Sequence, residues 1–179
     1  MISEIKKIVE YSLYKIDCYS DDALALVVRT GNAESGYRAL KGYGEGNPAI
    51  GFWQIEPATL YDMMRNYIAY RPAYRKALEG LGMEFTGDDI EMSVMSNMAV
   101  QAALCRLHYR RDSKPIPSWD DLESQGEYWK RVYNTIQGRG TVKHFVKANK
   151  DVLLDKRYIR YSPYCKYFCL IDRILNIIV

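Results

Sequence analysis

Glu34 is the residue in this chain whose position best suits it for acid–base chemistry. It follows the apolar stretch DALALVVRTGNA (residues 22–33), which predicts a helix through the core, and it precedes a glycine-rich stretch. We therefore expect its carboxyl group at the rim of a cleft with an apolar wall behind it, where burial raises a carboxyl pKa toward the range of a general acid. The alternative is a solvated glutamate, although the negative end of a helix dipole is an unfavourable place for a carboxylate.

Short motifs follow one another in a fixed order along the chain. They are Glu34-Ser35, GFWQIEPAT at residues 51–59, the asparagine-initiated NMAVQAAL at 97–104, and VYNT at 132–135 with Gly138 and Gly140 behind it. Together they resemble the signature of the soluble lytic transglycosylase family, within the lysozyme-like superfamily. The stretch that begins YWKRVYNT at residue 128 also resembles bacteriophage-encoded members of that family. The resemblance covers about residues 22–145.

The resemblance implies an enzyme that cleaves the β-1,4 bond between N-acetylmuramic acid and N-acetylglucosamine in bacterial peptidoglycan. Glu34 would be the single catalytic carboxyl, acting first as acid and then as base. Ser35 would hold this acid or contact the bridging region, and Gln54 would hydrogen-bond sugar substituents on the cleft floor. Tyr133 would place its hydroxyl on Glu34, and Asn134 would fix the backbone of that segment. The resemblance implies no cofactor and no metal ion.

The motifs depart from the family pattern in ways that affect the shape of the cleft more than its chemistry. Phe52 and Trp53 replace a Leu-Met pair, and an aromatic ring there offers a face on which a sugar could stack. We therefore expect both to contact substrate, with the backbone of residues 52–55 alongside it. Val132 stands in place of a small alanine, and Gly138 follows Asn134 by four residues rather than two.

A glycoside hydrolase usually needs a second carboxylate, roughly 5–9 Å from the first. Glu45, among glycines in GYGEGNP, is the candidate on the loop, with a solvated charge as the alternative reading. Glu56, directly before Pro57, is better explained as a charge at a helix N-terminus. The transglycosylase route is therefore preferred, in which the muramic acid C6 hydroxyl attacks C1 and leaves a 1,6-anhydro end. The alternatives are a hydrolytic lysozyme, a chitinase-like hydrolase, and a catalytically silent virion or cell-wall-binding protein.

Composition limits the classes of protein that fit. A chain of 179 residues fits one domain, and a net charge of +3 is too small to indicate a nucleic-acid-binding protein, although it is compatible with an anionic cell wall. The 16 tyrosines suit wet, carbohydrate-like ligands as well as cores. No CxxC pair or zinc-like spacing is present, so we expect reduced and mostly buried thiols at Cys18, Cys105, Cys165 and Cys169. His108 and His144 have no partner pattern and are assigned core or surface roles.

The two ends of the chain bear on where the protein acts. The N-terminal stretch carries Glu, Lys and Asp at apolar positions, so no signal peptide is expected. The apolar stretch FCLIDRILNIIV at residues 168–179 is too short to span a bilayer, so no membrane insertion is expected. We expect a protein made in the host cytoplasm that acts on peptidoglycan in the periplasm or cell wall, either carried in a virion or released at lysis. The apolar C-terminal segment is expected to be either a core helix or a docking surface for other virion proteins, which are then candidate partners.

The hydrophobic pattern predicts a mainly α single domain over residues 1–179, with a motif-bearing core at about 22–145 and a C-terminal helical extension at about 150–179. The resemblance implies that this domain has the α+β lysozyme-like fold. A long loop over residues 35–52, or a small β-hairpin within it, is expected to line the cleft. Asp21 and Asp22 are expected at the N-cap and first turn of the second helix. Helices are predicted over residues 2–16, 21–34, 57–70, 71–80, 88–110, 120–136 and 141–154.

Overall fold

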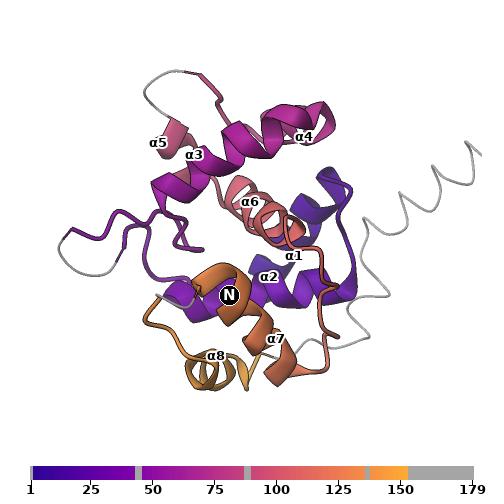
Figure 1. The fold of residues 1–179 in the computed structure, drawn as a ribbon, viewed down its shortest axis with the longest axis vertical. Coiled ribbons are helices and arrows are strands. Elements are labelled where there is room, and N and C mark those ends of the chain that lie inside the picture. The colour runs from indigo at the N-terminus through magenta and orange to yellow at the C-terminus, as the bar shows by residue number, and fades with distance from the viewer. Residues whose placement is uncertain (1, 43–45, 87–89, 136–137, 153–179) are drawn as a thin grey trace, which may run out of the picture.

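The structure, a computed structural model, describes residues 2–42, 46–86, 90–135 and 138–152. Within these ranges the chain is mainly α-helical, as the sequence predicts (Figure 1). The α-helices are α1 (Ile2–Lys15), α2 (Asp21–Ser35), α3 (Pro57–Asn66), α4 (Pro72–Gly80), α5 (Ile90–Met95), α6 (Met98–Arg110), α7 (Leu122–Trp129) and α8 (Val142–Asn149). Two shorter elements are the 3₁₀-helix η1 (Ile68–Tyr70) and the π-helix η2 (Lys130–Asn134). Most of the predicted C-terminal extension lies outside the described residues.

Helices α2 and α6 form the centre of the molecule, because both are apolar around most of their circumference. Helix α1 packs against both of them, and α8 packs against α2 and α7. In Figure 1, α3, α4 and α5 lie on one side of α6, and α7 and α8 lie on the other. None of the described helices is long and apolar enough to cross a membrane.

Helix α2 begins and ends where local chemistry favours a boundary. The Ser20 hydroxyl accepts a hydrogen bond from the backbone N–H of Ala23 at 3.1 Å, so Ser20 is the N-cap, one residue before the predicted Asp21. Gly36 ends the helix in the left-handed conformation with φ 57°, and its N–H donates to the carbonyl of Asn32. The prediction that this helix ends just after Glu34 is confirmed.

Three predicted helices are interrupted in the structure. The segment predicted as a single helix over residues 88–110 is divided because the Asn97 side chain accepts hydrogen bonds from Ala99 and Val100 and starts α6. This agrees with the asparagine-initiated helix expected from the motif. The helix predicted over residues 57–70 ends at Asn66, and the one predicted over 120–136 changes to a π-helix after Trp129.

The loop between α2 and α3 contains no β-hairpin in its described residues, 36–42 and 46–56. Its backbone pairing consists of two isolated bridges, Lys41 with Ile50 and Ile50 with Ile55. Gly51 has φ +72°, and a Cβ there would lie 2.4 Å from the Gln101 side chain. The loop therefore turns directly against α6, which only glycine permits at this position.

Candidate active site

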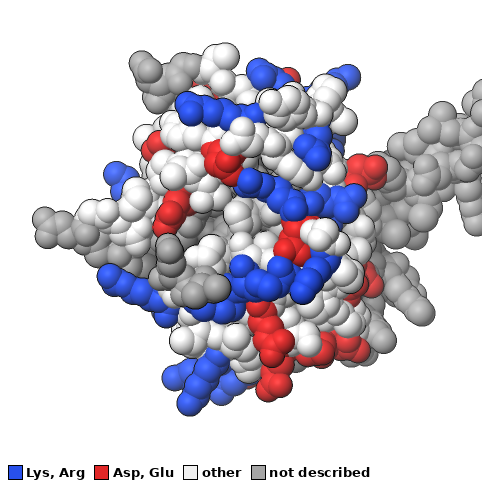
Figure 2. Space-filling view, viewed as in Figure 1, with Lys and Arg blue, Asp and Glu red and all other residues white. Residues whose placement is uncertain are grey.

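A cleft of about 710 Å³ lies between the loop, α3, α6 and the segment around η2. The face shown in Figure 2 is hollowed near its centre, and acidic and basic side chains are intermixed around it. Segments far apart in the sequence contribute to its lining: the end of α2, the loop before α3, and residues that follow α7. The described residues that line it and matter for the chemistry are Glu34, Gln54, Glu56, His108, Trp129, Tyr133 and Asn134.

Glu34 lies in the last turn of α2 and lines this cleft, as its sequence position predicts. Burial raises the pKa of its carboxyl group from 4.5 to about 7; a hydrogen bond from Trp129 acts in the opposite direction, and the negative charge of Glu56 adds to the increase. The acid is thus protonated up to neutral pH while it still faces an open cleft. That combination suits a general acid.

The hydrogen-bond donor to Glu34 is Trp129 rather than the expected Tyr133. The indole Nε1–H of Trp129 donates to Glu34 Oε1 at 2.9 Å. The hydroxyl of Tyr133 donates instead to the backbone carbonyl of Trp53 at 2.8 Å. The physical reason is the position of η2, which directs the Tyr133 ring toward α6 and the motif loop. Burial raises the pKa of Tyr133, and the nearby charges of Cys105 and Glu34 add to the increase.

Two aromatic rings of α6 hold Tyr133 in place. Its ring stacks on Tyr109 at 5.4 Å between centroids, and it meets His108 edge-on at 5.2 Å. His108 Nε2 lies 3.0 Å from the carbonyl of Val132, and because a carbonyl only accepts, this nitrogen carries the proton. Burial lowers the pKa of His108, so the ring is neutral at neutral pH. His108 therefore has a structural role at the cleft wall, in keeping with the core or surface role expected from the sequence.

Gln54 lines the cleft, so its side chain is accessible to a ligand there. Its backbone is left-handed with φ 49°, an unusual conformation for a residue other than glycine. Its amide Nε2 donates to the carbonyl of Gly51 at 2.8 Å, which stabilises the turn that Ile50 and Ile55 close with a pair of backbone hydrogen bonds. Strain of this kind is frequent at functional sites, and here it presents the Gln54 side chain to the cleft.

Ser35 and Phe52 lie behind the cleft and do not line it. The Ser35 hydroxyl donates to the carbonyl of Phe52 at 2.7 Å and accepts from the N–H of Tyr37 at 3.1 Å. The Phe52 N–H donates in turn to Gln101 Oε1 at 2.7 Å. Ser35 thus joins the end of α2 to the motif loop. The expected direct contacts of Ser35 and Phe52 with substrate are replaced by this supporting role.

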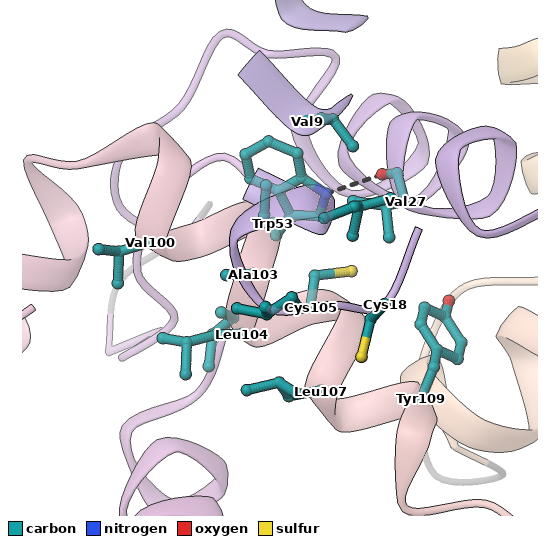
Figure 3. Close-up of a cluster of buried hydrophobic side chains, with 14 of the residues drawn as sticks. Val9, Cys18, Val27, Trp53, Val100, Ala103, Leu104, Cys105, Leu107 and Tyr109 are labelled. Atoms are coloured by element: carbon teal, nitrogen blue, oxygen red, sulfur yellow. Dashed lines mark hydrogen bonds between the residues drawn. The ribbon is translucent and has the colours of Figure 1, made fainter. Parts of the chain in front are cut away.

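Trp53 is part of the hydrophobic core, so the prediction that it offers a stacking surface for a sugar is wrong. Its side chain is 0% exposed, and its indole N–H donates to the carbonyl of Val27 at 2.8 Å (Figure 3). Figure 3 shows the ring among apolar side chains of α1, α2 and α6. Burying so large an apolar ring stabilises the fold, and here it also anchors the motif loop against α2.

Asn134 ends η2 and helps to shape the loop that follows. Lys130 Nζ donates to Asn134 Oδ1 and to the carbonyl of Gly138, both at 2.8 Å. A Cβ on Gly138 would lie 2.0 Å from the Asn134 carbonyl oxygen, so glycine is required for this close approach. The expected role of Asn134 in fixing the backbone of its segment agrees with these contacts.

A second carboxylate, that of Glu56, also lines the cleft. Glu56 is the N-cap residue of α3, as its position before Pro57 predicts, but its side chain makes no capping hydrogen bond there. It is exposed, and its charge raises the pKa of Glu34. The other predicted candidate, Glu45, lies outside the described residues. Among the described residues, no three His, Cys, Asp or Glu side chains gather in a way that could hold a metal ion.

Trp129 is the site residue that sequence reasoning missed, although it lies in the YWKRVYNT stretch at residues 128–135. The clue available in the sequence was an indole, a donor with no charge, four residues before the motif tyrosine. Comparison of the chain with family models, with curated proteins and with solved structures found no match. The geometry of the cleft and the motifs therefore carry the functional argument.

Proposed function

We propose that this protein is a peptidoglycan-cleaving glycosidase in which Glu34 protonates the glycosidic oxygen between N-acetylmuramic acid and N-acetylglucosamine. The observation that carries the proposal is a carboxyl group with a pKa of about 7 at the wall of an open cleft of about 710 Å³. The order of the motifs supports membership of the lytic transglycosylase family and a lysozyme-like fold. The same resemblance supports a bacteriophage origin and action at the cell wall.

The geometry supports a mechanism in which Glu34 acts first as a general acid and then as a general base. Once Glu34 has given its proton to the leaving oxygen, the Trp129 N–H stabilises the carboxylate that remains. The carboxylate can then accept the proton of the C6 hydroxyl as that oxygen attacks C1, which forms a 1,6-anhydro ring and restores the acid. Gln54 on the cleft floor would bind polar substituents of the sugars.

A hydrolytic lysozyme is the second candidate, and Glu56 is the observation that favours it. An exposed carboxylate in the same cleft could activate a water molecule as a general base. In that case the product ends in a reducing sugar that contains one added water. The Glu56→Gln variant separates the two routes, because it would abolish hydrolysis but leave anhydro formation in place.

The test compares the wild-type protein with Glu34→Gln on purified peptidoglycan sacculi. Glu123→Gln is the matched control, because Glu123 is exposed on α7 and lies outside the cleft lining. We expect clearing by the wild type and the control, loss of clearing with retained sedimentation on sacculi for Glu34→Gln, and 1,6-anhydro products by mass spectrometry. Undiminished clearing by Glu34→Gln would refute the assigned acid, and reducing ends alone would refute the transglycosylase route.

A further inference from the structure

We infer that Trp129 is the positioning residue of the catalytic acid. Its indole N–H determines which of the two Glu34 oxygens carries the proton and faces the substrate. The inference rests on the proposed function of Glu34 and adds a residue to which neither the motifs nor the expected roles assign a task. The contact that carries it is the Nε1–H to Oε1 hydrogen bond of 2.9 Å.

The chemistry of an indole makes this contact directional. An indole N–H only donates, and it does not titrate in the range where proteins are stable. The Glu34 oxygen that faces it must therefore accept in both protonation states of the carboxyl group. When Glu34 is protonated, the proton resides on the other oxygen, Oε2. Trp129 thus keeps the acid in one orientation without adding a charge that would lower the pKa strongly.

The surroundings of Trp129 hold the indole rigidly. Its side chain is 1% exposed, and its ring packs on Phe145 of α8 with centroids 5.2 Å apart. On another side the chain passes close by at Gly140, where a Cβ would lie 2.5 Å from Trp129 Cη2. Glycine at this position leaves room for the ring. Supporting groups of this kind are needed to hold a reacting carboxyl in a productive geometry.

The position of Trp129 in the chain also links the acid to the rest of the cleft. Trp129 is the last residue of α7 and directly precedes the π-helix that carries Tyr133 and Asn134. π-Helical turns inside helices are frequent at functional sites, because they rotate the following side chains relative to the preceding ones. Here the change lets the indole face Glu34 while Tyr133 reaches the motif loop.

The first test observes the contact directly and needs no enzyme activity. The protein has three tryptophans, so the indole N–H resonances can be followed by NMR over pH. We expect the Trp129 resonance to shift with a midpoint of about 7, the value for Glu34, and this titration to vanish in Glu34→Gln. Trp53, which donates to a backbone carbonyl, is the internal control and should not titrate with that midpoint. A Trp129 resonance that stays constant, or that still titrates in Glu34→Gln, would overturn the inference.

The second test measures the effect on catalysis. Trp129→Phe retains an aromatic ring and removes the donor, so kcat should fall by roughly 10-fold to 100-fold while KM changes little. The hydrogen bond lowers the Glu34 pKa, so its loss should move the alkaline limb of the activity profile above pH 7. A purely structural role would lower stability and leave that limb in place.

Two further variants keep the test decisive. Trp53→Phe is the matched control for the loss of a buried indole, and its alkaline limb should stay near that of the wild type. Gly140→Ala retains the Trp129 side chain but forces it to move. It should therefore shift the alkaline limb of the activity profile in the same direction as Trp129→Phe does. This keeps the test decisive if Trp129→Phe itself folds poorly. An inactive wild type would refute the proposed function, whereas normal rates and pH dependence in both Trp129→Phe and Gly140→Ala would refute the positioning role alone.

Discussion

Replacing Glu34 with glutamine should stabilise the protein at alkaline pH, because the ionised, buried carboxylate destabilises the folded state. Its pKa is about 7 in the folded state against 4.5 for an ordinary glutamate. Between these values the folded state retains a proton that the unfolded state has released, so the free energy of unfolding falls as pH rises from 4.5 to about 7. Glutamine is neutral throughout, and its amide oxygen can still accept from the Trp129 N–H.

The size of the effect follows from the shift. A difference of about 2.5 pH units, from 4.5 to about 7, at 1.36 kcal/mol per unit gives about 3 kcal/mol. Partial exposure of the carboxyl to the cleft reduces this to about 2–3 kcal/mol. At pH 8 Glu34→Gln should therefore unfold at a melting temperature roughly 5–10 °C above the wild type, and at pH 4.5 the difference should nearly disappear.

Urea denaturation followed by tryptophan fluorescence at pH 4.5, 6 and 8 measures this difference. The midpoint should rise in Glu34→Gln at pH 8 with an unchanged slope, since the slope reflects the surface exposed on unfolding. Glu123→Gln is the control for loss of an exposed carboxylate and should show no comparable pH-dependent gain. A stability difference between Glu34→Gln and the wild type that is the same at all three pH values would refute the raised pKa.

Three further variants test the surroundings of the acid. Glu56→Gln removes a like charge and should lower the Glu34 pKa, so the alkaline limb of kcat/KM should move to lower pH; an upward shift would contradict this coupling. Gly51→Ala places a Cβ against the Gln101 side chain at a positive φ and should cost roughly 2–4 kcal/mol in urea denaturation, with a loss under 1 kcal/mol arguing against the close approach. Tyr133→Phe leaves the Trp53 carbonyl without its donor and should lower the free energy of unfolding by about 1–3 kcal/mol. The pH midpoint of activity should stay near that of the wild type. A large shift of this midpoint would mean that the Tyr133 hydroxyl acts on Glu34.

The position of Glu34 could be predicted because it depends on local sequence. A nearly all-apolar helix that ends at a glycine must run through the core and emerge at its edge, so the carboxyl next to that end has a buried side and an open side. Asn97 was likewise readable as a helix start because its capping bonds reach only two and three residues ahead. The position of Gln54 in the cleft lining could be predicted from the motif alone.

The errors at the candidate site concern contacts between distant segments. Whether Trp53 faces the cleft or the core depends on how the loop docks on α2, and the alternation of residues in a short loop does not determine this. The partner of Glu34 is 95 residues away along the chain, and its approach depends on the packing of α7 against α8. Sequence reasoning chose Tyr133 because a motif named it, whereas the π-helix carries its hydroxyl to another acceptor.

The hydrogen bonds between α8 and α2 determine when, during synthesis, the end of α2 becomes fixed. Asn32 Nδ2 donates to the carbonyl of Ala148 at 2.8 Å, and Asn149 Nδ2 donates to the carbonyl of Arg29 at 3.1 Å. These bonds secure the half of α2 that carries Glu34, and they can form only after the ribosome has released residue 149. A nascent chain that has folded α1 to α6 would hold its acid on a helix end that is still loose. The complete cleft would therefore form late in translation, when nearly the whole described chain is available.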